Sequence, residues 1–422
     1  MQMNLKALDV NPDNLVFTLQ ENSRSDLASG EQTHNDQTAP LFLNRMLLDA
    51  VKAGASDIHF EPFEQTLRIR LRVDGVMQEI NNLPVDFGRQ LIIRLKVIAG
   101  LDISEHYGTQ SGRFRMLLDD ATGLDFRCSI TPTLYGETVV LRLLYLPTSL
   151  LDLSILGLTD TQINQIQHAS QRLQGMILVT GPTGSGKTTT VYSMLQSIGG
   201  ESRNIVSIED PVEFGHPYVR QLSVDLKHEI SMNSGLRTIL RMDPDVLFIG
   251  EIRDCEAAQI GMRAASSGKY VFSSLHTRDI VSTITSLRNL GIENRSLAGC
   301  LSGIINQRLA RRLCSACKSV FEASPEQRDK FTAIGLEPPA QLYNPVGCEK
   351  CRGTGFHGRI GVFELSHLTA EFRKGIEDNL PASELDAILR AGGVRRLEDD
   401  ALSKAGQGLI RWEDAIEIRW LA

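Results

Sequence analysis

The first half of the chain is patterned for strands that are buried on one face only. In residues 67–73, apolar side chains alternate with arginines, which is typical of a strand with one buried and one charged face. Asp74-Gly75 then predicts a hairpin turn, and residues 58–61 predict a further strand. Apolar spacing over 87–99 predicts a helix. We therefore expect a smaller α+β domain over residues 39–149.

The second half is patterned for strands that are buried on both faces. Its apolar runs are continuous and alternate with helical patterns, which favours a parallel sheet covered on both faces by helices. The four expected strands are 176–180, 205–208, 246–249 and 271–274. Together they predict an α/β core over residues 160–309, joined to the first domain by a linker at 150–159.

The remaining segments follow neither pattern. Residues 1–38 are polar and acidic, and we expect a largely disordered tail with one short ordered piece near residues 15–17. Residues 310–365 contain two cysteine pairs, and residues 366–422 are expected to form a C-terminal helical region. Its predicted helices are 382–389, 399–407 and 412–418.

Composition and charge narrow the class of protein. The chain has 422 residues, of which 42% are hydrophobic and 23% charged, as in ordinary globular proteins. No apolar run approaches a membrane span and the N-terminus lacks a signal-peptide pattern, so we expect a cytoplasmic protein. A formal net charge of −7 argues against general nucleic-acid binding. In a reducing cytoplasm, Cys128, Cys255 and Cys300 are expected to be buried.

The segment Gly181–Thr188 is the strongest chemical signal. It fits the phosphate-binding pattern G-x-x-x-x-G-K-[ST], and it stands between an apolar strand and an amphipathic helix, as that loop requires. Lys187 would reach the β- and γ-phosphates of ATP, and the Thr188 hydroxyl would bind Mg²⁺. The predicted nucleotide-binding residues are Gly181, Pro182, Thr183, Gly184, Ser185, Gly186, Lys187, Thr188, Thr189, Glu209 and Asp210.

Three short polar segments, here called boxes, follow later strands at their carboxyl ends, where α/β sheets bind ligands. The first contains Glu209, Asp210 and Glu213, whose crowded carboxylates indicate a shared cation or water network, although a solvated acidic loop is the simpler alternative. In the second, Glu251 ends an apolar strand and is expected near Mg²⁺. The third contains His276, which could hydrogen-bond the γ-phosphate or be a structural histidine.

These boxes, in this order, resemble those of the secretion-motor ATPases of type II secretion and type IV pilus assembly. The segments Ala55–Pro62, Arg70–Gly75, Ser111–Arg113 and Arg127–Arg142 are similar to the family's N2 domain. The resemblance implies a RecA-like P-loop ATPase core with a parallel sheet, preceded by a PAS-like N2-type domain. It also implies that Glu213 orients the attacking water, that Glu251 is the Mg²⁺-associated acid, and that Arg127 and Arg142 approach the γ-phosphate.

Two cysteine pairs predict a metal site. Cys314 and Cys317 are spaced like Cys348 and Cys351, and four thiolates in such knuckles form a closed tetrahedral Zn²⁺ site. Disulfides are the alternative, which the missing secretion signal disfavours. The resemblance agrees, since extension-type members of the family carry such a subdomain and the retraction branch generally lacks it.

We therefore expect a homo-hexameric ATPase that uses ATP, Mg²⁺ and Zn²⁺. As the resemblance implies, it would work at the cytoplasmic face of the inner membrane and drive pilin or pseudopilin assembly through a platform protein. A DNA-uptake or conjugative pilus system would use the same chemistry. Alternatives of another class are a nucleotide-switched scaffold without turnover and a nucleic-acid translocase, which the charge disfavours.

Overall fold

The computed structural model describes residues 15–19, 38–118, 123–145, 148–170, 174–199 and 202–418. The chain divides into two compact units between residues 147 and 148, two residues before the predicted domain boundary. Among the described residues, no helix is both long and apolar enough to cross a membrane. Most of the predicted acidic tail lies outside the described residues. Its short ordered piece coincides with β1 (Val16–Leu19), which pairs with β5.

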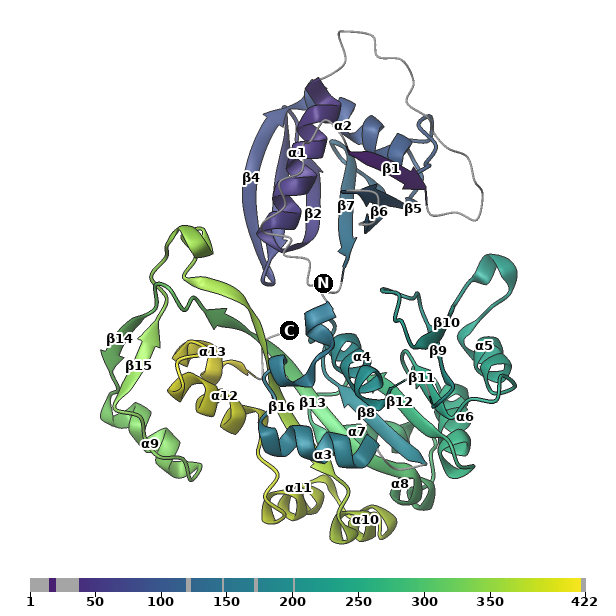
Figure 1. The fold of residues 1–422 in the computed structure, drawn as a ribbon, viewed down its shortest axis with the longest axis vertical. Helices are drawn as coiled ribbons and strands as arrows, with labels where there is room; N and C mark the ends of the chain where they lie inside the picture. The colour runs from purple at the N-terminus through teal and green to yellow at the C-terminus, as the bar shows by residue number, and fades with distance from the viewer. Residues whose placement is uncertain are drawn as a thin grey trace. The chain divides into compact units, whose positions relative to one another are not determined.

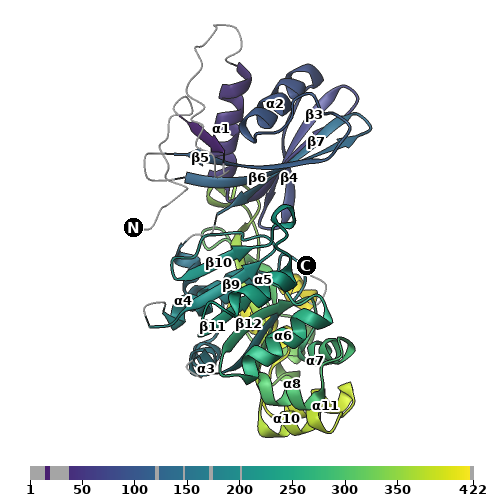
Figure 2. The ribbon, with the colours of Figure 1, turned by 90° about the vertical axis from the view of Figure 1, so that its right-hand side faces the viewer.

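The first unit is an antiparallel sheet with two helices on one face (Figures 1 and 2). The strand order is β1-β5-β6-β7-β2-β3-β4. The bounds are α1 Thr38–Ala53, β2 Ala55–Pro62, β3 Thr66–Val73, β4 Val76–Pro84, α2 Val85–Ile98, β5 Gln110–Leu117, β6 Gly123–Thr133 and β7 Gly136–Leu144. These elements match the α+β domain that the sequence predicts, and α2 begins two residues earlier than expected.

Alternation along β3 explains which sheet face the helices cover. Leu67, Ile69 and Leu71 are almost fully buried and share one core with apolar residues of α1 and α2. The intervening arginines face the other side, since successive side chains of a strand point to opposite faces. Asp74 and Gly75 both have positive φ, as a two-residue hairpin turn of type I′ requires.

The second unit is built on a seven-stranded, mostly parallel sheet with the order β10-β9-β11-β12-β8-β13-β16. Only β16 runs antiparallel, beside β13. Figure 2 shows α5, α6 and α7 on one side of this sheet and α3 and α4 on the other. The strands are β8 Gly175–Thr180, β9 Ile205–Glu209, β10 Val219–Ser223, β11 Val246–Ile249, β12 Tyr270–Leu275, β13 Leu301–Leu313 and β16 Phe356–His367.

The parallel core is the predicted α/β fold, and its four predicted strands all form. The sequence patterns did not reveal the long ribbon of β13 and β16. The helices of this part are α3 Asp160–Ser170, α4 Lys187–Ile198, α5 Met232–Ile239, α6 Cys255–Ser266, α7 Ile280–Asn289 and α8 Asn294–Cys300.

Residues 150–159 are part of the second unit, which corrects their interpretation as a linker. They contain two short 3₁₀ turns, η3 (Thr148–Leu151) and η4 (Leu153–Ile155). Leu153, Leu156 and Leu158 are each less than a tenth exposed. The burial of these three leucines stabilises the packing of the segment in the second unit, because each buried side chain removes apolar surface from water.

The C-terminal helices divide between two cores. Helices α10 (Ala370–Glu377) and α11 (Ala382–Ala391) bury Phe372 and Leu385 in the main core. Helices α12 (Leu397–Gly406) and α13 (Trp412–Ile416) pack instead with α9 (Pro325–Ala333) in a separate core. That second core also includes the antiparallel pair of β14 (Ser319–Glu322) and β15 (Gln341–Asn344). The cysteine-containing segment and the last two helices therefore form one structural layer.

Candidate nucleotide site and cysteine cluster

The predicted phosphate loop lies between β8 and α4, at the carboxyl end of a central strand. Gly186 occupies the N-cap position of α4 with φ of +86°, a conformation that glycine adopts without strain. Gly181 has φ of +144°, and a Cβ added there would lie 2.4 Å from the carbonyl oxygen of Gln307. The glycines are thus needed both for backbone conformation and for close packing.

Lys187 is the first residue of α4 and is 9% exposed. Its ammonium group donates to the carbonyl oxygens of Gly181 (2.9 Å) and Pro182 (3.0 Å), both within the loop. Burial lowers the pKa of Lys187 to about 8. An anion in the loop would replace these carbonyl contacts with stronger ones, because donor and acceptor would then both be charged.

His276 and Glu251 complete a chain of polar contacts that begins at Lys187. Nδ1 of His276 lies 3.3 Å from the Lys187 ammonium, and Nε2 lies 3.0 Å from a carboxylate oxygen of Glu251. The other Glu251 oxygen accepts from Arg253 at 2.9 Å, and Arg253 also reaches Asp210 at 3.0 Å. The structure therefore brings together three of the boxes that the sequence singles out.

The residues of the acidic box have different surroundings. Glu209 is 3% exposed, and its carboxylate accepts hydrogen bonds from Tyr192 (2.5 Å), Ser207 (2.6 Å) and Gln221 (3.1 Å). Burial and the nearby Glu209 carboxylate raise the pKa of the Tyr192 hydroxyl. Glu209 thus ties α4 to β9, and its predicted nucleotide contact stays a prediction. Glu213, by contrast, is exposed beyond the end of β9.

Mg²⁺ fits the donors at this site. A threonine hydroxyl and a carboxylate are oxygen ligands of the kind that Mg²⁺ prefers, and Thr188 and Glu251 supply them. In this structure both Glu251 oxygens are engaged, one by His276 and the other by Arg253. A direct or water-mediated contact with the ion would compete with these pairs.

Strand β13 contributes residues that sequence reasoning missed. Asn306 and Gln307 are at most 1% exposed, and their side-chain amides donate to Thr180 and to the Ser185 carbonyl. They are more than 100 positions from the loop in sequence, so no motif links them to it. Their one signal is a run of polar residues, Asn306 to Arg308, between apolar residues of a buried strand, where amides need partners.

The predicted arginines belong to a row across the sheet of the first unit. Arg127 lies directly opposite Arg142 on β7 and opposite Arg113 on β5, so all three point to one face. Arg142 donates to Asp57 at 2.9 Å. Among the described residues, Arg113 and Arg127 form no ion pair. Burial and the neighbouring Arg127 lower the pKa of Arg113, a third member of the row, which the sequence analysis placed in an N2-like segment without assigning it a role.

The four predicted metal cysteines form one cluster. The sulfurs of Cys314, Cys317, Cys348 and Cys351 all lie within 4.8 Å of one another. Three sulfur pairs are 3.7 to 3.9 Å apart. Four zinc–sulfur bonds of about 2.3 Å in a tetrahedron require sulfur separations of about 3.8 Å. The cluster therefore fits zinc, and all four thiols are free rather than joined as disulfides.

Backbone groups around the cluster favour thiolates. The N–H groups of Cys348 and Gly355 donate to the sulfur of Cys351 at 3.1 and 3.2 Å, and that of Gly347 donates to Cys317 at 3.3 Å. Although burial opposes it, the Cys348 and Gly355 donors lower the pKa of Cys351 to about 6, whereas burial raises the pKa of Cys317 to about 11. Of the remaining cysteines, Cys128 and Cys300 are buried as expected, but Cys255 is exposed because it begins α6.

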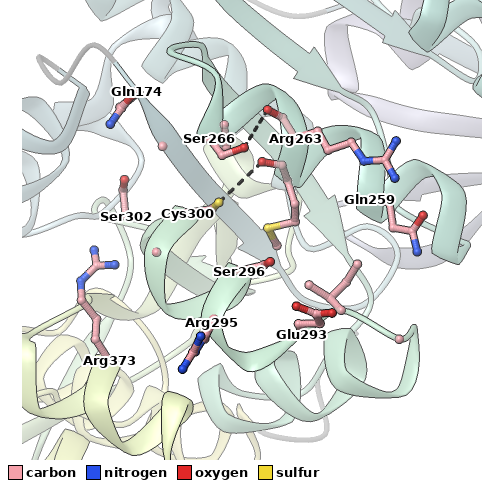
Figure 3. Close-up of a pocket in the computed structure, with 16 residues that line it drawn as sticks. Gln174, Gln259, Arg263, Ser266, Glu293, Arg295, Ser296, Cys300, Ser302 and Arg373 are labelled. Carbon is pink, nitrogen blue, oxygen red and sulfur yellow. Dashed lines mark hydrogen bonds between the residues drawn. The ribbon is translucent and has the colours of Figure 1, made fainter.

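A cavity of about 1080 Å³ lies at the amino end of β8, whereas the phosphate loop follows the carboxyl end of that strand. It is lined by Gln174 and Gly175, which precede and begin β8. Figure 3 shows Arg263, Arg295 and Arg373 directed to different sides of this cavity. Because these guanidinium groups do not converge, the cavity offers no common anion site, and it is separate from the candidate nucleotide site.

Comparison with known sequences identifies the family to which this chain belongs. Residues 31–417 match the family described as type II/IV secretion system protein, and the chain belongs to that family. The type IV pilus assembly ATPase PilB of Acinetobacter baylyi is 40% identical over 377 residues, which span 88% of this chain and 65% of the relative. PilB of Pseudomonas aeruginosa is 38% identical over 96% of this chain and 71% of its own length.

Type II secretion relatives are equally similar. The type II secretion system ATPase E of Vibrio cholerae is 40% identical over 91% of this chain and 76% of its own length. Among solved structures, the pilus retraction motor PilT with bound ADP matches 88% of this chain and 95% of its own, at a TM-score of 0.60 and 27% identity. The ATPase DotB of Legionella pneumophila shares the fold over 90% of this chain and 95% of its own, with a TM-score of 0.67 at 21% identity.

Proposed function

We propose that this chain is an ATP hydrolase whose turnover powers the assembly of a type IV pilus or a type II secretion pseudopilus. The convergence of Lys187, His276 and Glu251 at the end of the central strands carries the proposal. The relatives named as pilus assembly and secretion ATPases support it. The chain spans about two thirds of the first of these relatives, so the assembly role is an inference from family membership.

Each site residue has a defined task in this reaction. The loop amides and Lys187 bind the β- and γ-phosphates, and the N-terminus of α4 adds a favourable dipole. Glu213 orients a water molecule for attack on the γ-phosphorus and accepts its proton as ADP leaves. His276 contacts the γ-phosphate and senses its loss. Bound Mg²⁺, held through Thr188 and Glu251, supplies charge neutralisation of the phosphate oxygens.

The arginine row supplies the remaining positive charge. Arg127 and Arg142 would face the γ-phosphate from the first unit of the same chain or of a neighbouring chain. A guanidinium at that position stabilises the charge of the transferring phosphoryl group, which is worth roughly 10³–10⁵ in rate in other nucleotide hydrolases. Since neither Arg113 nor Arg127 forms an ion pair among the described residues, both are available for an anion.

The mechanical output follows from assembly into a ring. We propose a homo-hexamer, peripheral to the inner membrane on its cytoplasmic side, in which ATP turnover changes the arrangement of the two units. This motion would be passed to a membrane platform protein and from there to pilin or pseudopilin subunits. The cysteine cluster favours assembly over retraction, since it matches the zinc subdomain expected of extension-type motors.

Turnover measurements test the proposal directly. ATP hydrolysis by the full zinc-loaded chain is compared with the Glu213→Gln and Lys187→Ala variants, and oligomer size is read in the same samples. Loss of the general base lowers kcat by about 10²–10⁴-fold. The exposed Glu337→Gln variant is the matched control and keeps wild-type turnover. Tight ATP binding without turnover in any sample would favour the switched-scaffold alternative.

A further inference from the structure

Strand β13 runs parallel to β8, the strand that leads into the phosphate loop. The register places Asn306 beside Thr180, the last residue of β8. Gln307 therefore stands next to Gly181, where the loop begins. Asn306 and Gln307 are buried, at 0% and 1% exposure, in a strand whose other residues around them are mostly apolar. Burying two amides in such a strand is costly unless each has a partner.

Gln307 lies against both ends of the phosphate loop, but its side chain has one hydrogen-bond partner among the described residues, at the end of the loop, and its Oε1 is buried without one. Its Nε2 donates to the Ser185 carbonyl oxygen at 2.6 Å, and a Cβ added to Gly186 would lie 3.2 Å from the same nitrogen. The backbone carbonyl oxygen of Gln307 is the atom that excludes a side chain at Gly181. The Gln307 side-chain amide thus fixes the direction of the Ser185 peptide group, while its backbone packs against the start of the loop.

The partners of Asn306 join two different segments of the site. Its Nδ2 donates to the Thr180 hydroxyl at 2.8 Å and to the Thr277 carbonyl oxygen at 3.2 Å. Thr180 immediately precedes the loop, and Thr277 immediately follows His276. One buried amide therefore ties the loop to the histidine that lies 3.3 Å from the Lys187 ammonium.

We propose that Asn306 and Gln307 are positioning residues for nucleotide hydrolysis, with Gln307 shaping the phosphate loop and Asn306 setting His276 against it. The inference rests on the hydrolytic function proposed above. Gln307 acts on nucleotide binding, because it orients backbone groups that contact phosphate. Asn306 acts on turnover, because it holds the residue that contacts the γ-phosphate. A purely structural role for both residues would lower stability without separating these two effects.

Gln307→Met tests the first half, because it keeps the length of the side chain and removes the amide. The dissociation constant of a fluorescent ADP analogue is measured with the zinc-loaded full chain, together with the melting temperature. We expect binding to weaken about 10-fold, as for a lost hydrogen bond that leaves a buried carbonyl unpaired. Ser302→Ala, on the same strand and 5% exposed but beside Gly175 at the far end of β8, is the matched control and keeps wild-type affinity.

Unchanged affinity in a folded Gln307→Met protein would overturn this assignment, as would an equal loss in Ser302→Ala. If the methionine variant does not fold, Gln307→Asn keeps an amide that is one methylene too short to reach Ser185, and it gives the same comparison. A wild-type chain that binds no nucleotide contradicts the hydrolytic function itself. Wild-type turnover with unchanged variants contradicts only the positioning roles.

Asn306→Ala tests the second half through a split between binding and turnover. We expect kcat to fall about 10-fold while the dissociation constant for ADP changes less than about two-fold. In a His276→Ala background the same substitution should cost no further turnover, since both changes remove one coupled unit. Additive losses in the double variant, or an equal loss of ADP affinity, would show that Asn306 does not act through His276.

Discussion

Strand β13 contributes to two candidate ion-binding regions, which are built in opposite ways. At Gln307 it supports the phosphate loop, and seven residues later, after about 23 Å of extended chain, it enters the cysteine cluster at Cys314. The loop is held by glycine packing and hydrogen bonds from neighbouring strands. The cluster gathers four sulfurs whose thiolate forms repel one another. The first region is shaped without a ligand, whereas we expect the second to depend on its metal for shape.

Removing the metal should therefore have the largest effect on stability, and we expect that effect to be confined to the layer that contains the cysteine cluster. Because Cys314 is fully buried in the cluster, Cys314→Ser or a strong chelator should unfold the layer formed by α9, α12 and α13. Structural zinc sites contribute about 10–16 kcal/mol of folding free energy in isolated peptides. Trp412, which stacks on Phe331 in this core, reports the change by fluorescence. An unchanged Trp412 signal in zinc-free protein would break the comparison.

Lys187→Ala should have the opposite profile, with lost function and an intact fold. We expect ATP affinity to fall at least about 100-fold, because the variant loses charge-assisted contacts to two phosphates. The melting temperature without nucleotide should stay or rise, since the buried ammonium is costly in the empty loop. The penalty is fully present at pH 7, below the lowered pKa of about 8, and fades as pH rises from there toward the unfolded value of 10.5.

Lys318→Ala gives the reciprocal control for Lys187. The Lys318 ammonium donates to the Gly408 carbonyl at 2.7 Å and lies over the Tyr343 ring, both in the cysteine layer. Calorimetric melting should show a loss of about 1–2 kcal/mol for this variant, with unchanged ATP affinity. A loss of nucleotide binding in Lys318→Ala would mean that the two regions are coupled through β13.

The same contrast explains what could be predicted from the sequence. The phosphate loop and the two cysteine knuckles are contiguous motifs, so residues such as Lys187 and Cys314 could be assigned from spacing alone. Asn306 and Gln307 could not, because their roles depend on which strands become neighbours. Parallel pairing of β13 with β8 follows only from the complete sheet.

The fold itself shows the same division between local and long-range information. Helices and strands with clear periodicity, such as α2 and β3, form within a few residues of the predicted bounds. The interpretation of 150–159 as a linker was wrong because the burial of its leucines depends on the tertiary core. Likewise, no local pattern assigns α12 and α13 to the cysteine layer rather than to the main core.

Two glycine substitutions give a smaller, quantitative test of the pre-shaped loop. At Gly181 an added Cβ meets the Gln307 carbonyl at 2.4 Å, whereas at Gly184, with φ of +79°, nothing lies within 4 Å. We expect Gly181→Ala to lower the free energy of unfolding by about 2–4 kcal/mol, and Gly184→Ala by only about 1 kcal/mol from backbone strain. Denaturant unfolding without nucleotide measures both. Equal losses would mean that the loop yields easily at Gly181 and is not held by β13.

Cys255→Ser should have the smallest effect on stability, and it tests whether zinc binds outside the four-cysteine cluster. Cys255 is exposed at the start of α6, and its sulfur accepts only a weak hydrogen bond from Gln259 at 3.2 Å. Serine keeps that acceptor, so stability should change by less than about 0.5 kcal/mol. Zinc content should remain one ion per chain, as the four clustered thiols alone require. A lower zinc content in this variant would mean that metal also binds outside the cluster, and Trp412 fluorescence would then no longer report on a single site.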